Sequence, residues 1–167
     1  MIDTNFKTAN FSIREFWSEA EDGPMSQDIF ENICFTMTEL QKIRDKYGKP
    51  MKVNCGWRSP AHNSRVGGSP TSAHLHGYAA DIDGKSDSEN DEIGVLILKM
   101  AKAGEIMLDQ LIFEDFTAPD GFKWIHYSPK KDRTTAPRNQ VMIAMGPRPF
   151  KYQSVTPELA KKFSIEL

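Results

Sequence analysis

The chain has few cysteines, no long apolar run and no excess of charge of either sign. Its 167 residues include only two cysteines, Cys34 and Cys55, which form no metal-binding pattern. They could pair, but two free thiols in a reducing compartment are the expected state. No apolar stretch is long enough to span a bilayer, so membrane insertion is not expected. With 21 Lys and Arg against 23 Asp and Glu, the formal net charge of −2 gives no reason to expect nucleic acid as a partner.

The N-terminus and the length set further bounds. The first residues, MIDTNFKTANF, lack a basic region followed by an apolar stretch, so no secretory signal is expected. The length suits one domain over residues 1–167, with a core over about residues 11–150 and a C-terminal extension over residues 151–167. We expect a monomer that is made in the cytoplasm.

Hydrophobic periodicity predicts both helices and strands. Apolar residues at helical spacing predict helices over residues 27–47 and 89–103, the first of which could break near Asn32. Cap residues predict shorter helices that begin near Ile13, Pro60 and Thr156. Alternating segments predict strands over residues 51–57, 78–83, 110–115, 122–128 and 139–145. These elements predict an α+β fold, in which helices flank one side of a small, mainly antiparallel sheet and the functional site lies on the other.

Alternation also predicts which side chains share a face. It places Val53, Cys55 and Trp57 on one face of the first strand, and Asp81 and Asp83 on one face of the second. A turn around residues 119–121 is expected between the third and fourth strands.

The segment SAHLHGYAADID, residues 72–83, concentrates groups that bind metal ions. Imidazole nitrogens and carboxylate oxygens are common zinc ligands, and a catalytic zinc keeps one position open for water. His74 and Asp81 are seven positions apart, so a turn could carry the first and the following strand the second. His126, in the predicted strand WIHYS, offers a third ligand. Any one of these residues alone would be better explained by an ordinary structural role, but the three in this spacing favour a metal site.

The runs NCGWRSPAHNSRVGGSPTSAHLHGYAADID, QLIFE and WIHYS together resemble a known family. It is the zinc D-Ala-D-Ala carboxypeptidase family (peptidase M15), and the resemblance is to its small domains of phage and prophage type. The shared pattern is S-x-H-x-x-G-x-A-x-D followed by a distal W-x-H, and the resemblance covers roughly residues 11–128. It implies the fold shared by DD-peptidases and the hedgehog signalling domain, with Zn²⁺ held by His74, Asp81 and His126.

The resemblance also implies a substrate and a route to it. The substrate would be a stem peptide or cross-link of peptidoglycan, cut as by a D-Ala-D-Ala carboxypeptidase or a murein endopeptidase. Without a signal of its own, the enzyme would reach the cell wall by holin-dependent release, as a phage endolysin does, or be carried on a virion. A zinc-containing wall-binding or phage structural module without catalysis, and a hydrolase of another amide, are the alternatives.

The general base is less closely defined by the pattern. In some members of the family an acidic residue lies three positions before the distal histidine, where this chain has Lys123. Glu114 instead matches the small-domain branch, in which a glutamate ends a Q-L-I-x-E strand, and it is the predicted base. Asp115 and Asp120 are alternatives, and an exposed carboxylate at a strand end is the other interpretation of Glu114.

Two further residues have predicted roles at the site. Arg58, at the end of the first strand, would bind the substrate carbonyl as it becomes an oxyanion, unless it forms a salt bridge that fixes the loop. Ser72 resembles the family serine that contacts the substrate peptide. A hydroxyl that stabilises the turn is an equally good interpretation of Ser72.

Overall fold

The computed structural model of the protein describes residues 2–115, 122–146, 150–162 and 165. The turn predicted around residues 119–121, which includes the alternative base Asp120, lies outside these ranges. Within the described ranges, every helix is too short or too polar to cross a membrane. The helices are α1 (Ile13–Phe16), α2 (Glu19–Asp22), α3 (Gln27–Tyr47), α4 (Pro60–Arg65), the 3-10 helix η1 (Ala73–His76), α5 (Asp87–Lys102) and α6 (Pro157–Lys162). The strands are β1 (Lys52–Cys55), β2 (Ala80–Asp83), β3 (Gln110–Glu114), β4 (Trp124–Ser128), β5 (Gln140–Met145) and β6 (Lys151–Ser154).

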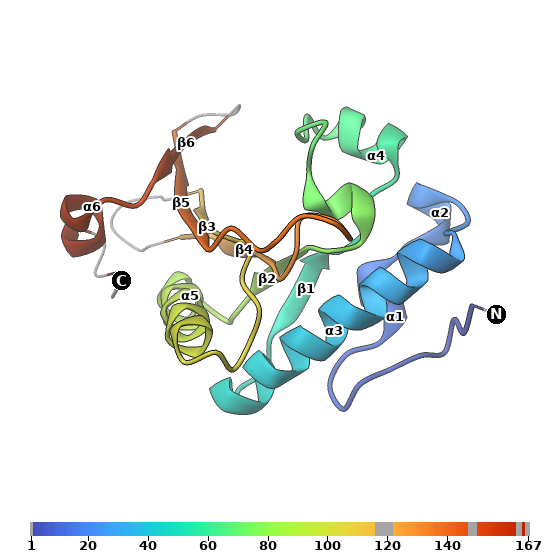
Figure 1. The fold of residues 1–167 in the computed structure, drawn as a ribbon, viewed down its shortest axis with the longest axis horizontal. Coiled ribbons are helices and arrows are strands. Elements are labelled where there is room, and N and C mark those ends of the chain that lie inside the picture. Colours follow the sequence, from blue (N-terminus) through green and yellow to red (C-terminus); the bar gives the residue numbers. More distant parts are fainter. Residues whose placement is uncertain (1, 116–121, 147–149, 163–164, 166–167) are drawn as a thin grey trace.

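The strands form one sheet in the order β1-β2-β4-β3-β5-β6 (Figure 1). Neighbouring strands run antiparallel except for β3 and β5, which are parallel. The α+β class and the mainly antiparallel sheet are therefore confirmed. Strand β6 was not predicted, because all four of its residues are exposed and no alternation marks them. It lies in the expected C-terminal extension and pairs with β5.

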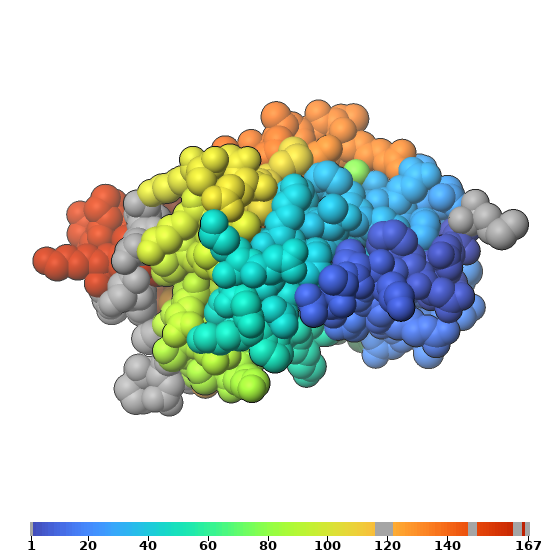
Figure 2. Space-filling model, turned by 90° about the horizontal axis from the view of Figure 1, so that it is seen from below, coloured from blue at the N-terminus to red at the C-terminus, as the bar shows by residue number. Residues whose placement is uncertain are grey.

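The two faces of the sheet carry different side chains. On one face Leu111, Phe113 and Ile125 are fully buried, and α5 contacts β2, β3 and β4. Helix α3 packs against α5 and α1 on the same side, and these helices with the N-terminal residues cover the face seen in Figure 2. Gly94 allows α5 to lie close to β3, because a Cβ there would come within 2.3 Å of the Phe113 ring. The polar residues that alternate with this core point to the opposite face.

The predicted helices form for the expected reasons. Helix α3 spans residues 27–47 without a break at Asn32, and Gly48 ends it in the left-handed conformation. Helix α1 has the predicted capping box between Ser12 and Glu15. Helix α5 begins two residues earlier than predicted, because the side chain of Ser86 caps it by accepting a hydrogen bond from the backbone of Glu89. Helix α2 was not predicted.

Strand β1 contains a shift of register that corrects one prediction. Val53 pairs with Ile82 in the core, whereas Cys55 lies opposite Asp81, with the irregularity between them. The extra residue turns Cys55 to the side of the sheet that carries Asp81. The prediction that Val53, Cys55 and Trp57 share one face of a strand is therefore wrong.

Candidate metal centre and active site

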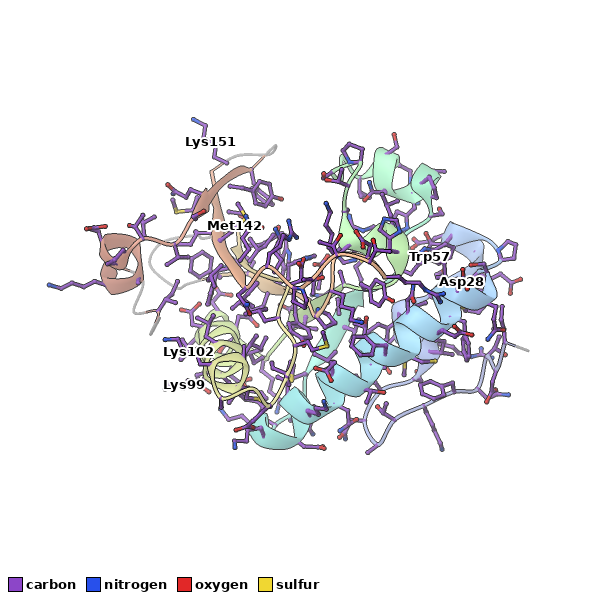
Figure 3. The ribbon with its side chains drawn as sticks, in the orientation of Figure 1. Asp28, Trp57, Lys99, Lys102, Met142 and Lys151 are labelled. Atoms are coloured by element: carbon purple, nitrogen blue, oxygen red, sulfur yellow. The ribbon has the colours of Figure 1, made fainter. Side chains whose placement is uncertain are left out.

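A cleft of about 1130 Å³ lies over the polar face of the sheet. Its floor is formed by side chains of β2, β4, β3 and β5, and its two rims include Val66, just after α4, and Tyr152, on β6. Helix α4 and strand β6 stand apart at the upper right and upper left of Figure 1. Met142 on β5 and Trp57 after β1, which both line the cleft, are likewise separated in Figure 3. The cleft therefore extends across the sheet from the side of α4 to the side of β6.

The three predicted metal ligands meet on the floor of this cleft. Asp81 on β2 and His126 on β4 are register partners, so their side chains leave the sheet on the same face. His74 reaches them from η1, with Nε2 lying 3.1 Å from Asp81 Oδ1 and 3.1 Å from His126 Nδ1. The third side of the triangle, from His126 Nδ1 to Asp81 Oδ1, is 3.0 Å. Three residues that are far apart in the sequence thus present one atom each to a common point.

A backbone carbonyl fixes the orientation of the His74 ring. Nδ1 of this ring lies 2.5 Å from the carbonyl oxygen of Gly56, which can only accept, so Nδ1 donates. In the neutral ring Nε2 then has a lone pair, and this is the atom that faces Asp81 and His126. The Gly56 carbonyl is held by close packing, because a Cβ at Gly56 would lie 2.5 Å from the backbone of Phe16.

Charge and burial keep His74 and Asp81 in the protonation states that a metal ion needs. Burial lowers the pKa of His74 against the opposing effect of the Asp81 carboxylate, so the imidazole is neutral at neutral pH. For Asp81, burial acts to raise the pKa, but the facing imidazoles outweigh it and the pKa is lowered. One neutral imidazole and one carboxylate therefore face the common point.

The triangle fits a small tetrahedral cation. With bonds of about 2.0–2.1 Å, such an ion separates its ligand atoms by about 3.3–3.4 Å, only a few tenths of an ångström more than the separations here. Without a cation, a proton on His126 Nδ1 is needed to relieve the repulsion between the lone pairs. The other ring nitrogen of His126, Nε2, is buried with no hydrogen-bond partner among the described residues. Nδ1 is the ring nitrogen that faces His74 and Asp81, so it is the one that can bind an ion at the common point.

The predicted base, Glu114, lies beside these ligands. It is 8% exposed at the end of β3, and one oxygen of it lies within 4.8 Å of ligand atoms of Asp81 and His126. Its register partner is Trp124, two residues before His126, so the two strands bring it to the same face of the sheet. Asp115, in contrast, has a positive φ of 55° and is not among the described residues that line the cleft. Of the two described candidates, Glu114 is the one in reach of the site.

Arg58 and Ser72 also line the cleft. Nη2 of Arg58 lies 3.9 Å from Asp81 Oδ2, the carboxylate oxygen outside the triangle. The Nε of Arg58 is buried with no hydrogen-bond partner among the described residues. Ser72 caps η1, because its hydroxyl accepts from the backbone N–H of His74 at 3.3 Å. The turn-stabilising role of Ser72 is thus observed, and its position in the cleft also allows contact with a ligand.

The structure adds residues to the site that the sequence did not single out. Cys55 brings its thiol within 4.8 Å of ligand atoms of His74 and Asp81. Burial, and then the Asp81 carboxylate, raise the pKa of this thiol to about 12, so it is protonated at neutral pH. Cys55 and Cys34 are both free, as expected. Asp83, predicted to share a face with Asp81, accepts a hydrogen bond from Asn54 at 2.7 Å.

Only the bulge in β1 brings Cys55 and the Gly56 carbonyl to the site. A bulge depends on the pairing of two strands, so a motif in one segment of the sequence does not reveal it. The glycine in the run NCGW was the one sequence feature that could have indicated an irregular strand end.

Comparison with known proteins gives two matches. A family model described as peptidase M15 matches residues 5–112. A segment of 52 residues is 48% identical to a zinc D-Ala-D-Ala carboxypeptidase of Streptomyces albus G. That segment is 30% of this chain and only 20% of the length of the relative.

Proposed function

This chain belongs to the peptidase M15 family, and we propose that it is a zinc-dependent peptidase that cuts stem peptides or cross-links of peptidoglycan. One observation carries the proposal. Single atoms of His74, Asp81 and His126 lie 3.0–3.1 Å from one another beside the nearly buried carboxylate of Glu114, on the floor of an open cleft. A structural zinc site is closed by four protein ligands, whereas three ligands beside a carboxylate are typical of a hydrolytic site.

The proposed metal ligands are His74, Asp81 and His126. When bound, a zinc ion supplies a water of lowered pKa and polarises the scissile carbonyl. The Gly56 carbonyl holds the His74 ring, so the lone pair of Nε2 is directed at the ion before the ion arrives. This preorganisation reduces the entropy lost on binding.

Glu114 is the proposed general base. Its carboxylate accepts a proton from the attacking water and then returns that proton to the leaving amine. Its position on a paired strand, with 8% of its surface exposed, limits the rotamers it can adopt and keeps it close to the ligands. A base held in this way contributes about 10²–10⁴-fold to the rate of such a reaction.

Arg58 is the proposed oxyanion-binding residue, and with Ser72 it contacts the substrate. Its guanidinium lies near the ligand triangle, where negative charge develops on the carbonyl oxygen, and its buried Nε has no partner in the described part of the chain. A donor placed at a developing oxyanion contributes about 10²–10³-fold to kcat. Arg58 therefore supplements the electrostatic effect of the cation.

The relative from Streptomyces albus G suggests the D-Ala-D-Ala bond as the first candidate. Because the match covers a fifth of that protein, a murein endopeptidase that cuts another bond of the stem peptide or a cross-link is equally within the proposal. Release as a phage endolysin is a further part of it.

The proposal is tested by digesting purified peptidoglycan with the wild type and with Glu114→Gln, each with its zinc content measured. We expect one zinc per chain in both proteins, and release of peptides by the wild type alone. Mass spectrometry of the products then identifies the bond that is cut. If the wild type holds zinc but releases nothing, a non-catalytic wall-binding or phage structural module replaces the peptidase. If it holds no zinc, the proposal fails at its basis.

A further inference from the structure

Arg138 lines the cleft from the segment that leads into β5, with 40% of its side chain exposed. Its partner is Asp109, a carboxylate that is fully buried just before β3. Nε of Arg138 donates to Oδ1 of Asp109 at 2.9 Å, and Nη2 donates to Oδ2 at 2.5 Å. The backbone N–H of Arg138 also donates to Oδ1, at 3.1 Å. The guanidinium is thus held in one orientation by a two-pronged pair.

A guanidinium held in this way can still bind an anion. It has more N–H donors than its two bonds to Asp109 use. Because the carboxylate of Asp109 is buried, breaking the pair would leave an uncompensated charge, so the orientation persists. A preorganised, planar set of donors matches the two oxygens of a carboxylate, and little side-chain entropy is lost when it binds one.

The register of the sheet places this group relative to the metal ligands. Gln110, next to Asp109, pairs with Ser128 on β4, which lies two residues beyond His126. Since Ile112 is the partner of His126, Asp109 lies three residues along the strands and one strand across from that ligand, or about 11 Å between backbone positions. Arg138, two residues before the partner of Gln110 on β5, lies four residues along and two strands across, or about 16 Å. An extended peptide advances about 3.3 Å per residue, so these distances correspond to about three to five residues.

We propose that Arg138 binds a carboxylate of the substrate about three to five residues from the bond that is cut, and that Asp109 is the positioning residue. This inference rests on the proposed peptidase function and adds to it a residue that selects among peptides. The C-terminal carboxylate of a departing single residue lies too close to the scissile bond to reach Arg138. The selected group is therefore a carboxylate carried further along the substrate.

A purely structural role for Arg138, as an anchor for residues 129–139, is the alternative. That segment already has another anchor, because Arg133 forms ion pairs with Asp28 at 3.3 Å and Glu31 at 3.1 Å on α3. Arg133 is not among the described residues that line the cleft. The two arginines of one segment therefore allow a matched comparison of a cleft guanidinium with an anchoring one.

The test uses soluble stem peptides in which one carboxylate at a time is converted to a carboxamide. Values of kcat and KM are measured for the wild type, Arg138→Gln, Arg138→Lys and the control Arg133→Gln. Binding of the same peptides to zinc-loaded Glu114→Gln, with and without Arg138→Gln, is measured by calorimetry. That second measurement does not depend on turnover.

One amidation should lower the wild-type kcat/KM by about 10–100-fold, mainly through KM, as expected for loss of a charge-assisted hydrogen bond. Arg138→Gln should cause the same loss with the carboxylate peptide and almost none with that amide. Arg138→Lys should recover part of the loss, and Arg133→Gln should leave both peptides unchanged. If Arg138→Gln does not fold, Arg138→Lys and the wild-type amide series still give the answer.

The inference would be overturned if Arg138→Gln lost the same kcat/KM with the carboxylate peptide and with its amide, or if the wild type had the same kcat/KM with every amidated peptide. Either result would leave the proposed peptidase function unaffected. If the wild type cuts no stem peptide and Glu114→Gln binds none, the proposed function fails and the inference fails with it.

Discussion

Two groups of histidine and carboxylate side chains line the same cleft. In one group the Nδ1 proton of the histidine points away from the carboxylate, and in the other it points toward it. In the first, His74 directs its Nδ1 proton away from the group, to the carbonyl of Gly56, and leaves a lone pair on Nε2. In the second, His62 Nδ1 lies 2.8 Å from Asp22 Oδ1, which also accepts from the backbone N–H of Ser59 at 2.8 Å. A carboxylate can only accept, so His62 directs its proton into the group. The first group offers lone pairs to a cation, whereas the second is a hydrogen-bonded tie between α2 and α4.

The difference shows that proximity alone does not make a metal site. Single atoms of Glu21, Asp22 and His62 lie within 4.8 Å of one another, as do those of Asp81, Glu114 and His126. In the group of Glu21, Asp22 and His62, however, the oxygen of Asp22 that faces His62 already accepts two hydrogen bonds. The direction of the imidazole proton, which the Gly56 carbonyl sets for His74 and the Asp22 carboxylate sets for His62, therefore separates a group that can accept a cation from one that holds two helices together.

The largest expected effect comes from removing His74 of the first group, and it is compared with the effect of removing His62 of the second. His74→Ala should lose its zinc and lower peptidase activity by more than about 10³-fold, because the acidified water and the polarised carbonyl are both lost. His62→Ala should keep one zinc per chain and most of its activity. Zinc content by atomic emission and initial rates measure both. Zinc lost from His62→Ala but kept by His74→Ala would reverse the assignment of the two groups.

The next effect comes from moving the carbonyl that orients His74. Gly56→Ala places a Cβ 2.5 Å from the backbone of Phe16, so the chain must shift there. Loss of the outer partner of a metal-bound imidazole should weaken zinc binding by about 10–100-fold, measured by competition with a chelator. Gly48→Ala is the control, since its φ of 75° strains an alanine far from the site, where no atom lies within 4 Å of the added Cβ. It should lower stability without changing zinc affinity. An equal loss of zinc affinity in Gly48→Ala would mean that the loss in Gly56→Ala comes from general destabilisation and not from the displaced carbonyl.

The sequence predicted the parts of the fold and site that depend on local pattern. The 21 residues of α3 were predicted from the helical spacing of their apolar residues, and α1 was predicted from its capping residues. The approach of His74, Asp81 and His126 followed from a family pattern, and the structure brings these residues together through the pairing of β2 with β4.

What the sequence could not give are features that depend on several segments at once. The bulge that turns Cys55 toward Asp81 is a matter of register between two strands. The hydrogen bond from His62 to Asp22 joins residues 40 positions apart. The exposed residues of β6 carry no period that marks a strand; they pair because β5 leaves an edge beside them.

A smaller effect is expected from breaking the second group. Asp22→Ala removes the acceptor of the Ser59 N–H and of His62 Nδ1, which should lower the free energy of unfolding by about 1–3 kcal/mol. Zinc content should not change. Asp45→Ala, which removes an exposed carboxylate from α3, should change stability by less than about 0.5 kcal/mol. Urea titrations with zinc analysis measure both variants, and loss of zinc from a stable Asp22→Ala would show that this group also supports the metal site.

The smallest effect should come from replacing Cys55. This residue tests most directly whether the site of His74, Asp81 and His126 leaves its fourth coordination position open to water. Its thiol lies within 4.8 Å of ligand atoms of His74 and Asp81, so geometry alone would allow a fourth ligand and a closed site. Burial raises the pKa of the thiol to about 12, and only a thiolate binds zinc well. Cys55→Ser should therefore change zinc affinity by less than about threefold, well below the effect of about 10–100-fold expected on disturbing the partner of a ligand. Cys34→Ser is the matched control for loss of a thiol. Loss of zinc from Cys55→Ser alone would mean that the cation forces the thiol to ionise, and the fourth position would then belong to the protein and not to water.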